Sequence, residues 1–221
     1  MTASSSARSS AAPDAPRRRY APRQPRELRR AQILDAAARL IAEHGWRGMT
    51  MERVAAEAGV AKSVSYAIFA SQAGLQRAVL LRAQEVTQER VTKALAAGRE
   101  ADSVAAGLGA GLTVYLESVA SEPAISKLVL LPIEGAPEAV REAIREGRER
   151  VRRQILAVVE DRLAHAHDHD HAGVALDVEL VAHLVRDNAE HLARLLVEQP
   201  ETFTPERLAT SVTALVRAVA P

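Results

Sequence analysis

The sequence predicts an all-α protein of roughly nine helices, and three observations lead to this class. Apolar residues recur at intervals of three and four along most of the chain, which is the spacing of one helix face. No segment shows the alternation of apolar and polar residues that is typical of a strand. Glycine, proline and capping residues separate the periodic segments at helical lengths.

Residues 26–75 predict three short helices, followed by a longer one. Gly45 ends the first helix, Thr50 caps the second, Gly59 makes the tight turn before the third, and Ser71 caps the fourth. The four expected helices cover about 26–44, 51–58, 62–69 and 72–97.

The remainder of the chain is expected to be helical almost throughout. Asp102 and Asp177 are candidate N-caps, Pro137 suits a first helical position, and Pro123 and Pro132 mark a broken apolar segment. The expected helices cover about 102–120, 137–164, 177–198 and 205 to near the C-terminus. The predicted domains are a disordered arm (1–25), an N-terminal three-helix domain (26–75) and a larger helical domain (76–221).

The composition excludes several classes of protein. The chain has 221 residues, of which 48% are hydrophobic and 26% charged, the balance of a globular protein. It has no cysteine, so disulfides, thiolate metal sites and cysteine nucleophiles are excluded. No uncharged apolar run approaches the roughly 18 residues of a membrane span, and no apolar core follows the N-terminal arginines. We therefore expect a cytoplasmic protein with no membrane partner.

The charge is distributed unevenly along the chain. Residues 1–75 hold 12 Lys/Arg and 6 Asp/Glu, a net charge of +6, whereas residues 76–221 hold 17 and 22, a net charge of −5. A basic N-terminal part indicates contact with a polyanion. The proline-rich, arginine-rich arm of the first 25 residues either follows a nucleic-acid groove or is a solvated tail.

The order helix, glycine turn, helix over residues 49–69 is the layout of a helix-turn-helix unit. Ala55 is small where the two helices cross, Gly59 suits the turn, and Val60 fixes the turn to the core. The alternative is a plain helical hairpin that binds nothing.

Residues 29–75 resemble the DNA-binding domain of TetR-type transcriptional regulators. The matching features are the run Ile33–Ala37, Gly45, Thr50, the run Val54–Val60, Lys62, Tyr66, Phe69, and Ser71 followed by Leu75. The resemblance implies a homodimer that binds a palindromic double-stranded operator, usually represses, and releases DNA when a small ligand enters the C-terminal domain.

The resemblance also implies roles for single residues. Thr50 at a helix N-terminus suits a phosphate oxygen, Lys62 can neutralise a phosphate, and Tyr66 can donate to the DNA backbone. Ser63, Val64 and Ala67 occupy positions that can face base edges in the family. Because these residues are small, they cannot form two hydrogen bonds to one guanine, so Arg47, the arm or DNA shape supplies part of the specificity. The predicted DNA-binding set is Arg47, Thr50, Lys62, Ser63, Val64, Tyr66, Ala67 and Gln72.

Three positions depart from the pattern of the family. Gln72 stands where a lysine is frequent, so an expected phosphate contact loses its charge. Ser65 stands where an apolar residue is usual, and either loosens the helix or adds a polar contact. Ala70 stands where a proline is frequent.

The last two expected helices carry apolar stripes that predict either a four-helix dimer interface or packing within one core. The predicted interface residues are Val181, Leu184, Leu192, Leu195, Leu208, Val212, Leu215 and Val219. Asn188 and His191, beside His183, line a ligand pocket, fix the dimer register or form a satisfied surface pair.

A small-ligand pocket is expected among the central helices, and no residue predicts a particular ligand. The predicted lining residues are Leu112, Tyr115, Leu116, Leu128 and Asn188, with Val129 and Leu131 nearby. The run Gly107, Gly109, Gly111 lacks the spacing and the preceding strand of a dinucleotide site, so we expect either a flexible or a closely packed helix and no cofactor.

The tract from His165 to His171 holds four imidazoles and two carboxylates, at His165, His167, His169, His171, Asp168 and Asp170. It either binds zinc, nickel or copper or is an exposed polar loop, and adventitious metal binding is expected over a specific site.

A ligand-responsive repressor is the leading hypothesis for function. The alternatives are a metal-responsive regulator that uses this tract and a helical interaction module that does not bind DNA. No G-x-S-x-G, P-loop or H-E-x-x-H motif is present, so we expect no enzyme.

Overall fold

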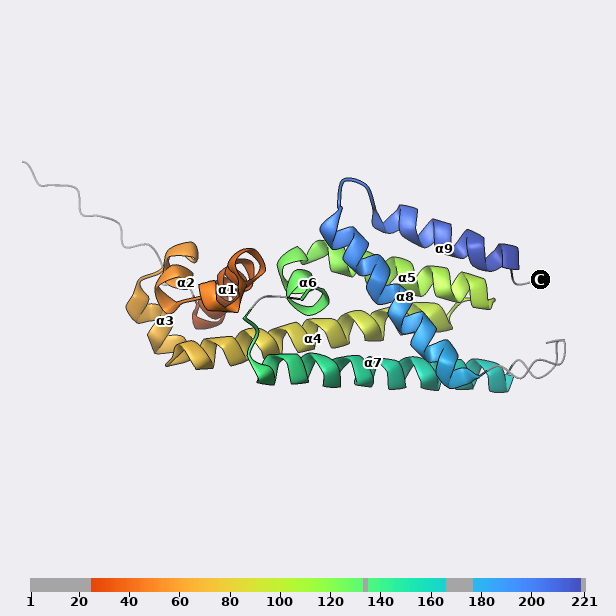
Figure 1. Cartoon of the computed structure of the whole chain (residues 1–221), viewed down its shortest axis with the longest axis horizontal. Coiled ribbons are helices and arrows are strands. Elements are labelled where there is room, and N and C mark those ends of the chain that lie inside the picture. Colours follow the sequence, from red (N-terminus) through yellow and green to blue (C-terminus); the bar gives the residue numbers. More distant parts are fainter. Residues whose placement is uncertain (1–24, 133–134, 166–176, 220–221) are drawn as a thin grey trace, which may run out of the picture.

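The computed structural model describes residues 25–132, 135–165 and 177–219, and places the side chains of all of these except residues 163–165 and 219. Within these ranges the chain forms nine α-helices and no strand, which confirms the predicted fold class (Figure 1). The predicted disordered arm, apart from Pro25, and most of the histidine tract lie outside the described residues.

The N-terminal helices agree closely with the local signals in the sequence. They are α1 (Arg26–Gly48), α2 (Met51–Glu57), α3 (Lys62–Phe69) and α4 (Gln72–Arg99). The caps at Thr50 and Ser71 are confirmed, because their hydroxyls accept from the backbone N–H of Arg53 (3.3 Å) and Gly74 (3.0 Å). Gly45 has φ 71° and interrupts the first helix as expected, but helical turns resume after it, so α1 reaches Gly48.

The remaining helices correct two expectations. They are α5 (Val104–Ser121), α6 (Pro123–Leu130), α7 (Glu138–His165), α8 (Val178–Glu198) and α9 (Pro205–Val219). Ser103, not Asp102, caps α5, because its hydroxyl accepts from the N–H of Ala106 at 3.2 Å. The segment expected to be broken forms α6, because Pro123 suits a first helical position. The Asp177 cap of α8 is confirmed.

The helices form an elongated molecule with α1, α2 and α3 at one end (Figure 1). The long helix α4 starts beside α3 and runs along the length of the molecule, and α7 lies alongside it. The helix α5 packs on α4, α8 and α9. The expected domain boundary at residue 75 therefore falls inside the continuous helix α4.

Two apolar cores meet at α6. The first joins α1 to α4 with residues of α6 and α7, and includes Ile125 and Leu128 of α6. The second joins α5, α6, α8 and α9, and includes Leu130 of α6. Because one short helix contributes to both cores, α6 ties the N-terminal helices to the C-terminal ones.

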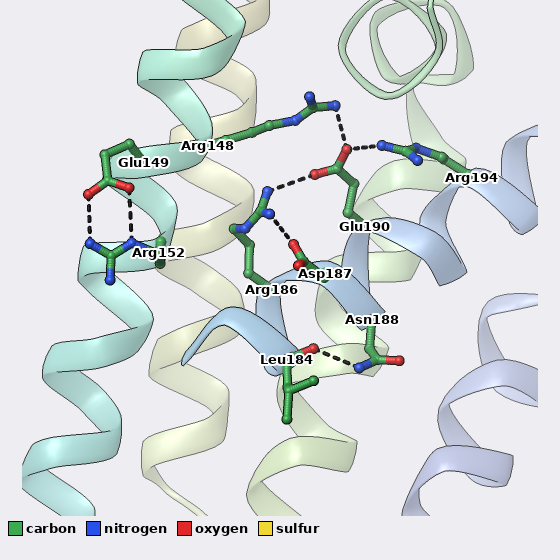
Figure 2. A network of polar contacts seen from close by, with 9 residues as sticks. All are labelled: Arg148, Glu149, Arg152, Leu184, Arg186, Asp187, Asn188, Glu190 and Arg194. Atoms are coloured by element: carbon green, nitrogen blue, oxygen red, sulfur yellow. Dashed lines mark hydrogen bonds and ion pairs between the residues drawn. The ribbon is translucent and has the colours of Figure 1, made fainter. Parts of the chain in front are cut away.

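A cluster of arginines around one carboxylate fastens α8 to its neighbours (Figure 2). The Glu190 carboxylate pairs with Arg148 of α7 and with Arg186 and Arg194 of its own helix, and its side chain is only 13% exposed. The Arg194 Nε also donates to the carbonyl of Leu130 at 3.0 Å, at the end of α6. The cluster thus connects three helices through charge-assisted hydrogen bonds.

By length and composition, the helix α5 could cross a membrane, although the sequence analysis expected no such segment. It was missed because the segment contains Glu117 and is not an uncharged run. The same apolar character suits its packing against α4, α6, α8 and α9.

The crossing of α4 and α5 depends on a pair of glycines. A Cβ on Gly107 would lie 2.7 Å from the carbonyl oxygen of Gly98, which is closer than real Cβ contacts allow. That carbonyl also accepts a hydrogen bond from Arg162 of α7 at 2.6 Å. The absence of a side chain at Gly107 therefore sets the distance between the two helices.

We predict that Gly107→Ala lowers the free energy of unfolding by about 1–3 kcal/mol, because the methyl group must displace the backbone of α4. The matched control is Gly147→Ala in α7, where the nearest atom to a new Cβ is the end of the Arg150 side chain at 3.9 Å. In this control the free energy of unfolding is expected to rise by up to about 1 kcal/mol, because alanine has a higher helix propensity than glycine. Urea unfolding measures both, and equal stabilities of the two variants would contradict the close crossing.

Candidate DNA-binding surface

Two hydrogen bonds and a left-handed glycine fix the turn between α2 and α3. Gly59 has φ 62°, a left-handed conformation that favours glycine. The N–H of Val60 donates to the carbonyl of Ala55 at 2.9 Å. The side-chain amide of Gln32, on α1, donates to the carbonyl of Ala58 at 2.7 Å. The turn is therefore held both by its own backbone and by α1.

The unit rests on a fully packed core. Trp46, Met49 and Met51 are buried around the connection from α1 to α2, and Val54 and Phe69 are buried on α2 and α3. Arg30 of α1 lies 5.7 Å from the centre of the Phe69 ring, a cation–π contact at the end of α3. This core fixes which face of α3 points outward.

The exposed face of α3 contains four of the predicted residues. Lys62, Ser63, Tyr66 and Ala67 are exposed and lie at helical intervals of one and four, so they share one side of the helix. Val64 is half-buried, which leaves it at the border of this face. The structure therefore brings five predicted residues onto or beside one surface, which we call the α3 face.

Lys62 is already paired within the protein. Its ammonium group forms an ion pair with Glu52 of α2 and lies 5.7 Å from the centre of the Tyr66 ring. The hydrogen bond from Lys62 lowers the pKa of Glu52, and the same bond raises the pKa of Lys62. Both groups are fully charged near neutral pH, so a phosphate must compete with Glu52 for this lysine.

The other predicted residues have different positions. Thr50 is half-buried at the start of α2 and uses its hydroxyl as a cap. The Gln72 amide donates to the carbonyl of Met49 at 2.9 Å, so it joins the start of α4 to the segment before α2. Arg47 is exposed, but its side-chain carbons lie against Gly135, in the segment before α7.

Arg53 is a basic residue that the sequence analysis missed. It is exposed in the first turn of α2 and donates to the carbonyl of Gly48 at 2.9 Å. Its place beside the Thr50 cap could have been noticed from the sequence, because a cation three residues after an N-cap lies on the same helix end.

Two of the three departures from the family pattern have structural consequences within α3. Ser65 is fully buried, and its hydroxyl has no hydrogen-bond partner among the described residues, so it adds no polar contact. Ala70 has φ 60°, a conformation that proline cannot adopt. The end of α3 therefore has a turn that excludes the proline frequent in the family and holds alanine in a conformation that favours glycine.

The predicted ligand-binding residues do not form one cluster. Leu116 is fully buried in the second core, with Leu112 and Tyr115 packed against it, whereas Leu128 belongs to the first core. Asn188 is exposed and donates to the carbonyl of Leu184 in its own helix at 2.7 Å (Figure 2). An open groove of about 610 Å³ lies elsewhere, lined by Gln84, Glu85, Gln88, Glu89, Thr92, Lys93 and Arg150.

The predicted dimer stripe divides into a buried and an exposed part. Leu208 is buried in the second core and Leu192 packs against it, so these two residues serve the chain's own core. Leu184 and Leu215 are 53% and 63% exposed. Val181, Leu195 and Val212 are half-buried, and the side chain of Val219 lies outside the described residues.

The histidine tract cannot be placed, because residues 166–176 and the side chain of His165 lie outside the described part of the chain. Within the described part, no group of three or more His, Asp or Glu residues could hold a metal ion.

The sequence of this chain is similar to those of bacterial transcriptional regulators. Residues 33–79 match the model of the tetR family of bacterial regulatory proteins. An uncharacterized HTH-type transcriptional regulator of Mycobacterium tuberculosis is 31% identical over 103 residues. That match covers 46% of this chain and 42% of the relative, so the chain spans less than half of the relative's length.

Solved structures share the fold at low sequence identity. The fatty acid degradation regulator FadR of Bacillus halodurans has a TM-score of 0.69 at 19% identity, over 87% of this chain and 96% of that one. A TetR-like regulator from Rhodococcus has a TM-score of 0.67 at 20% identity, over 90% and 100%. FadR of Bacillus subtilis, solved in complex with stearoyl-CoA, has a TM-score of 0.65 at 18% identity, over 84% of this chain and 96% of that one.

We predict that Ser65→Ala raises the free energy of unfolding by about 1 kcal/mol or more relative to Ser63→Ala, because it removes a buried hydroxyl without a partner. Ser63 is the matched control, since it is an exposed serine on the same helix and gains the same helix propensity. Thermal and urea unfolding measure the difference. A Ser65→Ala variant less stable than Ser63→Ala would show that the hydroxyl is satisfied.

Proposed function

We propose that this chain is a sequence-specific DNA-binding transcriptional regulator, because residues 33–79 match the model of the tetR family of bacterial regulatory proteins. It acts by binding in the cytoplasm and not by catalysis. Residues 26–75 form the DNA-binding domain, and the helices after residue 75 form the domain for ligand binding and dimerisation.

The α3 face supports the proposal. An exposed helix side can enter a major groove, and the small side chains of Ser63 and Ala67 let its backbone approach the base edges. Lys62 and Arg53 provide positive charge beside this face for phosphates, and Thr50 lies at the N-terminus of α2. The packing of α3 on α2 and α4 fixes the face in one orientation.

We further propose that the chain is a homodimer on an inverted-repeat operator. Leu184 and Leu215 are exposed on α8 and α9, and Leu180 of α8 is 55% exposed as well. Apolar side chains exposed along two helices are stabilised when a second copy covers them. A two-fold dimer would place two α3 faces on successive turns of one side of the DNA.

Release from DNA by a small ligand requires a connection between the two domains, and Arg82 provides one. Its guanidinium on α4 lies 2.9 Å from the Asp35 carboxylate on α1 and 3.9 Å from the Glu122 carboxylate between α5 and α6. A shift of α5 or α6 would therefore change a contact that holds α1. We propose that ligand binding favours a spacing of the two α3 faces that no longer fits DNA.

The proposal is tested by fluorescence-anisotropy titration of the full chain against DNA that flanks its own gene. Selective binding over scrambled DNA, with two subunits per site and a steep dependence on salt, is the expected result. The alternative of an interaction module that does not bind DNA predicts no selectivity at low salt. Because a FadR structure with this fold holds stearoyl-CoA, compounds with a long acyl chain are the first to test for release.

We predict that Lys62→Gln weakens operator binding and reduces the slope of log K against log salt by about one per subunit, because one phosphate contact is lost. The matched control is Lys93→Gln, since Lys93 pairs with Glu89 in the same way but lies near the far end of α4. Titration at several salt concentrations measures both slopes. An unchanged slope for Lys62→Gln would remove Lys62 from the DNA-binding set.

We predict that Leu184→Glu combined with Leu215→Glu converts the dimer to a monomer, because four carboxylates would be buried in the interface of the dimer. Leu81→Glu is the control, since Leu81 is 47% exposed but lies on α4. Light scattering after size-exclusion chromatography gives the molar mass. A dimer that persists in the double variant would contradict an interface over α8 and α9.

A further inference from the structure

Arg90 of α4 is a charged side chain inside the protein. Only 4% of the residue is exposed, and its Nη1 donates to the hydroxyl of Ser126 on α6 at 2.9 Å. Its Nε and Nη2 have no hydrogen-bond partner among the described residues. A buried guanidinium that uses only one of its three nitrogens is unusual, because buried polar groups are nearly always satisfied.

The charge of Arg90 is also poorly compensated. Burial lowers the pKa of Arg90, while Glu122 and Tyr115 act in the opposite direction, and arginine remains protonated in proteins. Glu122 is shared with Arg82, whose guanidinium lies 3.9 Å from it. The direct partner of Arg90 is the neutral Ser126, so the site has an excess of positive charge in a medium where such charge is costly.

The two free nitrogens have a defined geometry. Nε and Nη2 form one edge of the planar guanidinium, with two parallel N–H bonds, and this edge matches the two oxygens of a carboxylate. The third nitrogen holds the guanidinium in place through Ser126, whose hydroxyl is itself 2.9 Å from the carbonyls of Val119 and Glu122. The free edge is therefore oriented by the protein before any ligand arrives.

The helices α5 and α6, which both pack on α4, contribute apolar residues to the two cores. Val119 and Leu116 of α5 are fully buried in the second core, and Leu128 of α6 is buried in the first core. Burial raises the pKa of Tyr115 to about 12, so its hydroxyl is neutral near pH 7 and can donate to an anion. A ligand that reaches Arg90 meets one fixed cation between two apolar cores.

We propose that Arg90 binds the carboxylate of an apolar organic acid, whose carbon chain packs between α5 and α6. This assignment rests on the proposed function of the C-terminal helices as a ligand-binding domain, and it specifies the class of ligand. A carboxylate supplies the missing charge and the two missing acceptors in one plane. An alcohol or ester of the same chain supplies neither the charge nor the pair of equivalent oxygens.

The proposal is tested by isothermal titration of the full chain, without DNA, with decanoate, decan-1-ol and decyl phosphate below their micelle concentrations. The variants are Arg90→Lys, which keeps the charge but loses the side-on edge, and Arg90→Met, which removes the buried charge. Arg99→Lys is the control, because Arg99 is exposed on the same helix. Thermal unfolding of each variant shows that it is folded.

The expected result is that the wild type and Arg99→Lys bind decanoate, that Arg90→Lys binds at least about tenfold more weakly, and that Arg90→Met does not bind. Decan-1-ol is expected to bind the wild type at least about tenfold more weakly than decanoate. Equal binding of decanoate by folded Arg90→Met, equal binding of the alcohol, or tighter binding of the phosphate would overturn the proposal.

Failure of all straight-chain acids from acetate to hexadecanoate to bind would also overturn it. The operator titration on the same preparation separates this failure from failure of the proposed function. A chain that binds its operator but no acid keeps the regulator and loses the carboxylate site. A chain that binds acids through Arg90 but no DNA keeps the site and loses the regulator.

Discussion

The position of the DNA-binding helices relative to the rest of the protein depends on one helix, α6, which contributes to two apolar cores. Ile125 and Leu128 pack with α1 to α4, and Leu130 packs with α5, α8 and α9. Neither core can shift without α6, because close-packed interiors do not deform continuously. The hydrogen bonds of Ser126 and of the Leu130 carbonyl add polar constraints at the same helix.

Arginine provides these polar constraints throughout the C-terminal helices. Arg162 donates to the carbonyl of Gly98, at the end of α4, and Arg194 donates to the end of α6. Both contacts satisfy carbonyls that a helix end leaves unpaired. Arg90 differs from these residues, because it lies at the junction of the two cores and is only partly satisfied. A buried polar group that lacks partners needs an explanation, and for Arg90 the explanation that we propose is a ligand.

Local features of the fold could be predicted from the sequence, because they depend on neighbouring residues. The Thr50, Ser71 and Asp177 caps and the Gly59 turn are set within a few positions of the chain. Long-range packing could not be predicted: Leu208 and Leu184 belong to similar stripes, but only Leu208 is buried. The burial of Arg90 could have been predicted, because this residue continues the apolar spacing of Val79, Ala83 and Val86 on one face of α4.

Hydroxyl-radical footprinting of the full chain on DNA that flanks its own gene tests the central claim most directly. The account predicts protection of an inverted repeat on one side of the duplex, with half-sites a whole number of helical turns apart, because two α3 faces related by a two-fold axis enter successive major grooves. Uniform protection without a preferred site, or no protection at low salt, would contradict a dimeric sequence-specific regulator.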